Sequence, residues 1–400
     1  MKYNKYNAWT LALVSAGAVS LPAVAKADEH TNYVLTALST TTISGYVDTS
    51  IQWNPGTGNQ NLPLYTPNGA ASGTKADGFN LDSVALTISK PPGEGEWAAG
   101  YNATLLFGPD AVGFNNSFGS FPDDFSLVDT YVELRAPVGN GLDFKLGTFA
   151  SPLGYEVYQT GNNPNYTRSY GYELEPTQLT GLIAGYQFSP ALSAIAGVAN
   201  TWSAGINNRS SAPQGPQAES YKTYLGSLTL TAPDSMGFLS GSTLSGGIVN
   251  GYNLLVANGG AVETSFYAGA TVKTPLKALS VGLAFDYACL GSNQAAGAGV
   301  VNNSGYQWAG AVYLVYQATE KLSFNTRADY LNQSSYLATT GLPGSSFALT
   351  ESVQYSLWKN VLTRAEFRWD HACNGTYPWG AATGPLENEF MLALNVIYKF

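Results

Sequence analysis

Apolar and polar residues alternate along much of this chain, and the last eleven residues, FMLALNVIYKF, show the pattern most clearly. One face of this segment carries Leu392, Leu394, Val396, Tyr398 and Phe400. The opposite face is mixed, with Asn395 and Lys399 set among apolar residues. Because successive side chains of a strand point to opposite faces, this period of two predicts a β-strand. Taken alone, the segment fits the half-buried strand of any soluble sheet.

Similar segments recur along the chain, among them ISGYVDTSIQW (43–53) and WAAGYNATLLF (97–107), and their connections are alternately long and short. The long connections lie near residues 54–78, 108–123, 150–178, 204–220, 251–262, 291–304, 334–345 and 374–387. The short ones, with the Pro, Gly, Asn and Asp content of turns, lie near 91–96, 137–141, 189–191, 232–237, 274–278, 318–321 and 359–360. Eight long and seven short connections imply sixteen antiparallel strands, with both ends on one side.

The sorting of the connections by length separates two fold classes. Outer-membrane barrels have short periplasmic turns and long external loops, whereas a soluble sandwich has no reason for such sorting. Closure of the first strand on the last also pairs every backbone group within the lipid. We therefore predict an all-β fold, a transmembrane antiparallel up-and-down β-barrel of about 16 strands over residues 42–400. Aromatic residues near predicted strand ends fit interfacial girdles: Trp53, Trp97, Phe107, Trp202 and Trp369.

The first residues have the features of an export signal. Two lysines precede a short apolar stretch over residues 11–24, and the tripeptide at 25–27 fits the small-x-small cleavage pattern. We predict a signal peptide at 1–27 and a periplasmic N-terminal segment at 28–41, ahead of the barrel. No later run of about 18 apolar residues is present, so the sequence predicts no helical membrane span.

The composition narrows the class of protein further. Charged residues make up only 11% of the chain, against roughly 25% in soluble domains. Aromatic residues reach 13% and glycines number 44, which fits strands with a lipid-facing side and a small, polar inner side. Loss of Lys2, Lys5 and Lys26 with the signal peptide changes the formal charge from −9 to −12, which excludes nucleic acid as a partner. Two cysteines exclude a disulfide-dense scaffold. A secreted soluble β-protein, such as a lectin or solenoid, is the main rival on composition.

Catalytic and metal-binding signatures are missing from the sequence. Of two histidines, His30 precedes the first strand and His371 lies near a late strand end. The pair Asp370-His371 looks like half of a triad, but strand phasing places the two side chains on opposite faces. Neither the acidic pair at 123–124 nor the isolated histidines make a metal-ligand cluster. We predict no enzyme activity, no metal and no cofactor; an outer-membrane hydrolase stays a distant alternative.

Ionic residues on the predicted inner face are the first functional candidates. Phasing against outward aromatics such as Phe367 and Trp369 predicts these pore-lining residues: Arg135, Lys145, Arg327, Asp329, Arg364, Glu366, Arg368 and Asp370. They admit two interpretations. In one, mutually neutralising ion pairs keep the lumen wet. In the other, arginines on one wall and carboxylates on the other set up a transverse field that orients dipolar solutes. Under the second interpretation, Arg364 and Arg368 favour anions and could be replaced with little change in folding.

The loop 150–178 is the second candidate. It is long and rich in Tyr, Gly and Asn, and we predict a constriction built from Tyr155, Glu156, Arg168, Glu173 and Glu175. The alternative is an ordinary external loop. Its tyrosines offer either a surface for sugars or amino acids or packing for the loop itself.

Several segments together carry a family resemblance: TTISGYVDTSIQWNPG, FASPLGYEVYQTGNNPNYTRSYGYELEP, ADYLNQ, RAEFRWDH and the terminal VIYKF. The chain resembles the OmpL-like group of outer-membrane porins over nearly its whole length. This resemblance implies passive diffusion of small hydrophilic solutes and ions through a water-filled barrel, and it names no solute. The alternative function is a non-transporting surface barrel, an adhesin or receptor acting through its external loops. Expected partners are outer-membrane lipid, small solutes and the barrel-assembly machinery, which would read Phe400; the oligomeric state stays open, a homotrimer included.

The sequence leaves two features open, the environment of Glu351 and the pairing of the two cysteines. Glu351 falls on the predicted lipid face, so either a bulge turns it inward or the assigned phase is wrong there. Cys289 and Cys373 end two strands whose anchors lie roughly 19 Å apart along the sheet at about 4.8 Å per strand. A disulfide bridges about 7 Å at most between Cα atoms, so only folding of the loops could join the two thiols.

Overall fold

The computed structural model describes residues 33–36, 39–56, 77–93, 95–114, 125–202, 205–209, 221–254, 260–291, 304–334, 344–374, 379 and 386–400. The predicted signal peptide at 1–27 lies outside these residues and stays a prediction. The predicted boundary at residue 42 lies close to the first barrel strand, which begins at Ser39.

Strands form almost all of the described structure. They are β1 (Tyr33–Thr36), β2 (Ser39–Trp53), β3 (Gly78–Lys90), β4 (Ala98–Phe107), β5 (Phe125–Ala136), β6 (Leu142–Ala150), β7 (Gln178–Ser189), β8 (Leu192–Ala199), β9 (Thr223–Thr231), β10 (Thr243–Asn253), β11 (Ala261–Lys273), β12 (Leu279–Leu290), β13 (Gly305–Gln317), β14 (Leu322–Gln333), β15 (Ser345–Trp358), β16 (Val361–Asn374) and β17 (Asn388–Lys399). The helical pieces are η1 (Pro109–Phe114), η2 (Thr160–Asn162), α2 (Tyr170–Leu174) and η3 (Asp234–Leu239).

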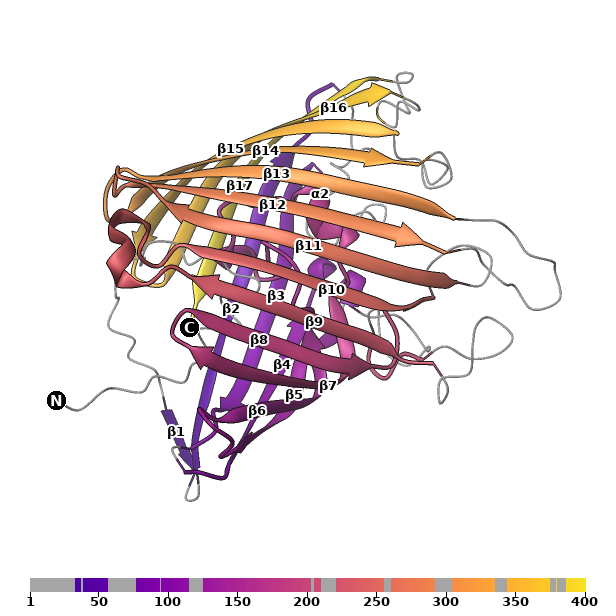
Figure 1. The fold of residues 1–400 in the computed structure, drawn as a ribbon. Coiled ribbons are helices and arrows are strands. Elements are labelled where there is room, and N and C mark those ends of the chain that lie inside the picture. The colour runs from indigo at the N-terminus through magenta and orange to yellow at the C-terminus, as the bar shows by residue number, and fades with distance from the viewer. Residues whose placement is uncertain are drawn as a thin grey trace.

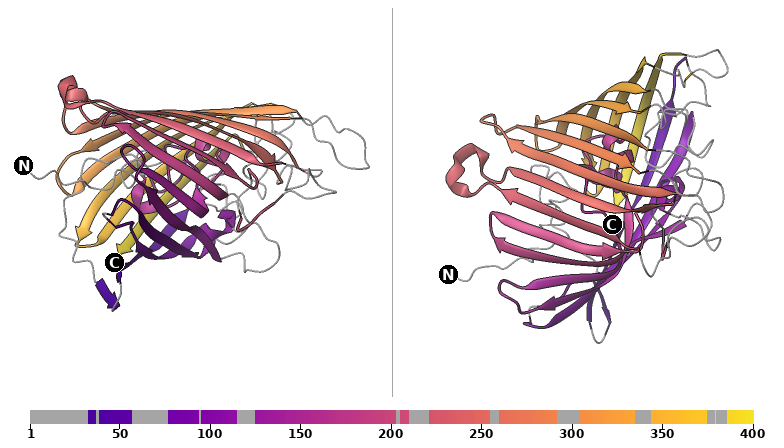
Figure 2. Two further views of the ribbon diagram at one scale, coloured as in Figure 1. Left: turned by 60° about the horizontal axis from the view of Figure 1, so that its bottom comes forward. Right: turned by 45° about the vertical axis from the view of Figure 1, so that its right-hand side comes forward.

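The sixteen strands β2 to β17 form a closed antiparallel barrel (Figure 1). Each strand pairs with the next along the chain, and β17 pairs with β2 to close the ring. The short strand β1 pairs with β2. Strands tilt steeply around the barrel, as the two turned views show (Figure 2). The predicted fold class and strand number are therefore confirmed.

The C-terminal residue makes the last contact of the closing strand. The backbone N–H of Phe400 donates to the carbonyl of Gly45, and the N–H of Gly45 donates to the carbonyl of Phe400, each at 2.9 Å. A Cβ at Gly45 would lie 2.7 Å from the Phe400 ring and 2.2 Å from the Ala85 carbonyl oxygen. Both distances are below van der Waals contact, so the ring and the neighbouring strand fit only against glycine at this position.

Alternation along the strands separates a lipid-facing side from an inner side. In β17, Leu392 and Leu394 are exposed on the outside, whereas Met391 and Ala393 are buried inside the barrel. Two register shifts change the phase locally, as bulges do: one leaves Asp82 of β3 as an extra residue opposite Asp48/Thr49 of β2, and the other adds a residue to β5 opposite 103/105 of β4. The closing strand therefore presents to lipid and to the lumen the residues that the sequence predicted, and pairing with it fixes which residues of its neighbours face inward.

Glu351 lies on the outer face of β15, and both explanations drawn from the sequence are wrong. Its cross-strand neighbours are Thr326 and Phe367, and the register is continuous around it, so no bulge turns it inward. The side chain is exposed, as the assigned phase required. The Thr326 hydroxyl donates to the carboxylate at 2.8 Å, which satisfies one lone pair of an otherwise unfavourable lipid-facing charge.

The two cysteines are both free thiols. Cys289 near the end of β12 is half-buried, and Cys373 near the end of β16 is exposed. The disulfide that the sequence left open is therefore absent.

Candidate functional site

The connection between β6 and β7, residues 151–177, folds into the barrel lumen; we call it the inner loop. It contains η2 and α2, and α2 lies inside the ring of strands in Figure 1. Tyr166, Arg168 and Tyr170 of this loop have no solvent-exposed surface. Hydrogen bonds join the loop to strands that lie more than 100 residues away in sequence, so it fills space that the barrel alone would leave to water.

Inward residues of β14 and β16 face the inner loop and form what we call the charged wall. Its members are Arg327, Asp329, Arg364, Glu366, Arg368 and Asp370. All six are predicted pore-lining residues, and all six are buried. The predicted inward phase of both strands is thus seen in the structure, but the side chains meet protein where the sequence had suggested open water.

The arginines of the charged wall donate mainly to loop oxygen atoms. Arg327 Nη1 donates to the Thr167 carbonyl at 2.6 Å and to the Glu156 carboxylate at 3.0 Å. Arg364 donates to the carbonyl oxygen atoms of Thr160 at 2.8 Å and Asn163 at 2.5 Å. Planar guanidinium groups suit this role because several donors lie in fixed directions.

Arg368 links the charged wall to the centre of the loop. Its Nη1 donates to the Arg168 carbonyl at 2.7 Å, while Nε and Nη2 donate to the two Asp370 oxygen atoms at 2.7 Å each. Asp370 also accepts from the Tyr170 hydroxyl at 2.8 Å, and the Arg368 guanidinium lies 5.6 Å from the Tyr170 ring centroid. Charge-assisted bonds of this kind are roughly twice as strong as neutral ones.

The carboxylates of the charged wall receive loop N–H groups. Glu366 accepts from the backbone N–H of Tyr166 at 2.5 Å and from the N–H and hydroxyl of Thr167 at 2.9 and 2.7 Å. Asp329 accepts from the Tyr170 N–H at 2.8 Å. Donors and acceptors of the loop backbone therefore both find charged partners, which fixes residues 160–170 against one side of the barrel.

Arg168 holds the inner loop together from within. Its guanidinium donates to the carbonyl oxygen atoms of Val157, Tyr158 and Tyr166 at 2.9–3.0 Å. These bonds tie the segment before η2 to the segment after it. The guanidinium also lies 5.5 Å from the Tyr172 ring centroid. The side chain that the sequence predicted to line a constriction thus shapes the inner loop from within.

Tyrosines of the inner loop reach the opposite and lateral walls. The Tyr166 hydroxyl donates toward Ser50 on β2 and Asp82 on β3 at 3.0 and 3.1 Å. The Tyr158 hydroxyl donates to Asp129 on β5 at 3.0 Å. Burial raises the pKa of both phenols, so each keeps the proton that it donates.

The side of the lumen formed by β7 to β13 is less charged. Tyr155 stacks on Tyr313 of β13 with ring centroids 4.2 Å apart, within an apolar cluster that includes Leu153, Ile183 and Leu225. The sequence left open whether the loop tyrosines form a solute surface or pack the loop. Tyr155, Tyr158, Tyr166, Tyr170 and Tyr172 are buried, which fits packing.

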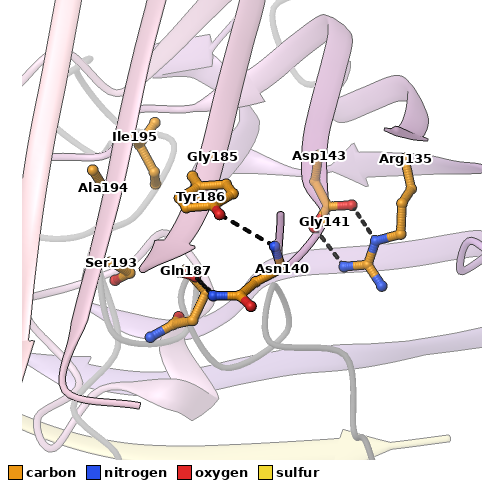
Figure 3. A pocket seen from close by; sticks show the side chains of 10 residues that line it. All are labelled: Arg135, Asn140, Gly141, Asp143, Gly185, Tyr186, Gln187, Ser193, Ala194 and Ile195. Carbon is orange, nitrogen blue, oxygen red and sulfur yellow. Dashed lines mark hydrogen bonds and ion pairs between the residues drawn. The ribbon is translucent and has the colours of Figure 1, made fainter. Parts of the chain in front are cut away.

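The predicted lining residues of β5 and β6 form a separate group. Arg135 donates from Nε and Nη2 to the two Asp143 oxygen atoms at 2.6 Å each, and Figure 3 shows this paired contact. A narrow cleft beside it, bounded also by Asn140 and Tyr186, holds about 20 Å³, room for about one water. Lys145 donates to the Tyr131 hydroxyl at 2.9 Å.

Sequence reasoning missed several inward residues that contact the inner loop, and two of them are carboxylates. Asp286 of β12 bonds to Glu175 and was not singled out, although alternation with Phe285 and Tyr287 would have placed it inside. Asp82 of β3 was missed because the strand bulges beside it. Of the predicted loop residues, Tyr155, Glu156, Arg168 and Glu175 are buried and Glu173 is exposed.

The described residues do not bring the Asp370-His371 half-triad or a metal-ligand cluster together. Asp370 points inward to Arg368, whereas the His371 ring lies on the other face, 3.0 Å from Asn388. Among the described residues, no three His, Cys, Asp or Glu side chains are grouped to hold a metal ion. No helix in the described part of the chain is long and apolar enough to cross a membrane.

A barrel of sixteen strands with a loop folded into its lumen is a porin architecture. Residues 40–400 match the family described as "Putative beta-barrel porin-2, OmpL-like". The chain belongs to this family. Membership confirms the resemblance seen in the sequence. The family is one of outer-membrane β-barrel channel proteins, which are not enzymes.

Solved structures similar to this porin-family barrel are also outer-membrane channels. The channel DcaP of Acinetobacter baumannii is 11% identical, with 92% of this chain and 99% of that chain covered and a TM-score of 0.61. The anion-selective porin from Comamonas acidovorans is 12% identical, with 90% and 99% covered and a TM-score of 0.57. OmpT of Vibrio cholerae, in its trimer form, is 12% identical, with 90% and 99% covered and a TM-score of 0.54. At such identities the likeness shows the fold. No curated protein matches the sequence.

Proposed function

We propose that this protein is a diffusion porin for small hydrophilic solutes and ions, with the inner loop as its constriction. The observation that carries the proposal is the attachment of residues 160–170 to the charged wall inside the barrel. A loop that served only as an external adhesive surface would have no need of buried charged partners in the lumen. A sixteen-stranded barrel has a wide lumen, and the loop narrows it.

Selectivity depends on which charges of the lumen stay unbalanced. Arg327 and Arg368 each pair with an aspartate two residues along the same strand. Arg364 has no carboxylate within ion-pair distance among the described residues, and it donates to Gln354 and to loop carbonyl groups. The interpretation as neutral pairs thus suits two of the three arginines. Arg364 carries the unbalanced charge that a transverse field would need, and Asp48 lies two strands along the same wall, beyond Asn395 of β17.

Conductance of the purified protein in planar bilayers tests the function. Stepwise ionic currents are expected from a porin, and none from a surface adhesin or receptor with a sealed lumen. A liposome-swelling panel of sugars, amino acids and organic acids then ranks the solutes. Swelling rates that fall with solute size support diffusion through a constriction; a barrel that admits no solute would contradict it.

We also propose assembly as a homotrimer in the outer membrane. The support is the fold shared with OmpT, whose structure was solved as a trimer. Mass determination of the protein in mild detergent, before and after heating, checks this proposal. We propose further that the signal peptide at 1–27 exports the chain and that the barrel-assembly machinery recognises Phe400. Identification of the N-terminal residue of the mature protein tests the cleavage site.

A further inference from the structure

Two carboxyl groups meet where the end of the inner loop reaches the least charged side of the lumen. Glu175 follows α2, and Asp286 points inward from β12 against Gly171, about one helical turn before Glu175, so the two carboxyl groups lie within reach of a shared hydrogen bond. Both are almost fully buried. Two carboxylates cannot donate to each other, so a hydrogen bond between the two groups requires a proton on one of them.

Glycines give the two carboxyl groups room. A Cβ at Gly154 would lie 2.1 Å from a Glu175 oxygen, and a Cβ at Gly171 would lie 2.3 Å from an Asp286 oxygen. Both glycines belong to the inner loop, and Gly154 has a φ of +117°, which other residues rarely adopt. The loop backbone is therefore shaped around the pair, and each carboxyl is enclosed by loop atoms.

The charged surroundings of the pair are acidic. Glu156 and Glu173 of the loop act on Glu175, and the Tyr155 and Tyr267 phenols lie nearby. No cation forms an ion pair with Glu175 in the described part of the chain. Burial and the neighbouring Asp286 raise the pKa of Glu175 well above its ordinary value. This contrasts with the charged wall, where every carboxylate has cationic or N–H partners.

We propose that the Glu175–Asp286 contact is a proton-dependent latch that holds the end of the inner loop against β12. With one shared proton, the contact attaches residues 171–175 to the wall. When this proton leaves, two adjacent carboxylates repel in a buried setting, and the segment moves away from β12. The charged wall keeps residues 160–170 in place, so the opening is a partial release of the loop beside β11 and β12.

The direction of the pH dependence follows from the raised pKa. The protonated contact is fully formed below the ordinary carboxyl pKa of about 4.3. The contact is lost as the pH rises through the raised pKa of Glu175. Between the ordinary pKa and the raised pKa, the equilibrium constant for release changes by about tenfold per pH unit for one proton. The latch rests on the proposed function only where it is measured as an ionic current through the channel.

Conductance measured across a pH series tests the latch. The unmodified channel is expected to conduct more, and to fluctuate more, as the pH rises. Glu175→Gln and Asp286→Asn each replace the shared proton by an amide N–H that never titrates, so both variants should stay at the low-pH conductance throughout. Glu133→Gln is the control, because Glu133 is a half-buried inward carboxyl of β5 outside the inner loop, and this variant should keep the pH dependence.

Hydrogen exchange of residues 151–177 supplies a readout that needs no current. Protection relative to Glu175→Gln should fall with rising pH in the unmodified protein. If the protein makes no channel but this loss occurs, the porin proposal fails and the latch stands. A pH-independent channel, or variants that retain the full pH dependence of the parent in both measurements, would overturn the latch.

Discussion

The Glu366 carboxylate on β16 accepts both the backbone N–H and the hydroxyl of Thr167, a residue 199 positions earlier in the chain. The same carboxylate accepts the Tyr166 N–H. A side chain on the barrel wall thus replaces the backbone partners that a strand or helix would give this stretch of loop. Charges in the lumen of this barrel therefore position the inner loop.

Glu366→Ala is expected to release the inner loop while leaving the barrel folded. Loss of the carboxylate leaves two buried N–H groups and the hydroxyls of Thr167 and Ser352 without this acceptor, at a cost of about 1–3 kcal/mol each before relaxation. The variant should conduct more noisily and expose residues 160–170 to limited proteolysis. Glu133→Gln on β5, a half-buried inward carboxyl, is the control and should resist the protease as the parent does. An uncut Glu366→Ala loop would show that other contacts suffice.

Replacing Arg364 and Arg368 together by Gln should shift the reversal potential toward cations at low salt. The sequence suggested little effect on folding, but both guanidiniums donate to loop carbonyl groups, so we expect greater loop mobility as well. Reversal potentials in 50–100 mM salt, where screening extends roughly 10–14 Å, measure the charge effect. Parental selectivity under these conditions would mean that neither arginine acts on passing ions.

A quadruple variant separates balanced pairs from a directed field. It adds Glu366→Gln and Asp370→Asn to the two arginine replacements, which restores the net charge of the charged wall. Recovery of parental selectivity would favour simple neutralisation. A persistent cation shift would favour the field, because Arg364 has no ion-pair partner in the described structure.

Arg168→Lys is expected to loosen the inner loop almost as much as removal of the side chain. A lysine keeps the charge but cannot direct donors to Val157, Tyr158 and Tyr166 at once. The guanidinium reaches these three acceptors from three nitrogen atoms, whereas an ammonium donates from a single one. Heat-modifiable gel mobility should stay normal while proteolysis within 151–177 rises. Equal resistance in parent and variant would show that the charge alone matters.

The fold was predictable because alternation and connection length are local properties. The phase of β16 against Phe367 and Trp369 is enough to place Arg364 and Arg368 on the inner face. Alternation gives the face of a side chain and not its partner. The contact from Arg364 to the Asn163 carbonyl leaves no trace in sequence, because every residue has a carbonyl group.

Glu351 shows a second reason why sequence reasoning fell short. The prediction for β15 assumes that a lipid-facing position excludes a charged side chain. The structure keeps the strand regular and gives the carboxylate one donor from Thr326. Continuous pairing on both sides outweighs the cost of one outward carboxylate, since a shift by one residue would turn every apolar side chain of the strand inward.

Closure of the barrel depends on the fit between Gly45 and Phe400. Deletion of Phe400 removes two backbone hydrogen bonds and should lower the yield of heat-modifiable barrel in outer membranes. Gly45→Val should do the same with the terminus intact, because its side chain would meet the Phe400 ring and the Ala85 carbonyl. Normal folded yield in both variants would contradict this role.

Removal of the outward charge should stabilise the barrel. Glu351→Leu replaces an exposed carboxylate on β15 by an apolar side chain next to Phe367. Charged residues at the lipid face cost up to about 2–4 kcal/mol for Arg or Lys and less for Glu, so a gain of about 1 kcal/mol is expected. Loss of the Thr326 bond offsets part of it, and Thr326→Val in the same chain should recover that part. Urea unfolding in lipid bilayers measures the change. Destabilisation by Glu351→Leu, with Thr326→Val neutral, would mean that the carboxylate has a favourable partner outside this chain.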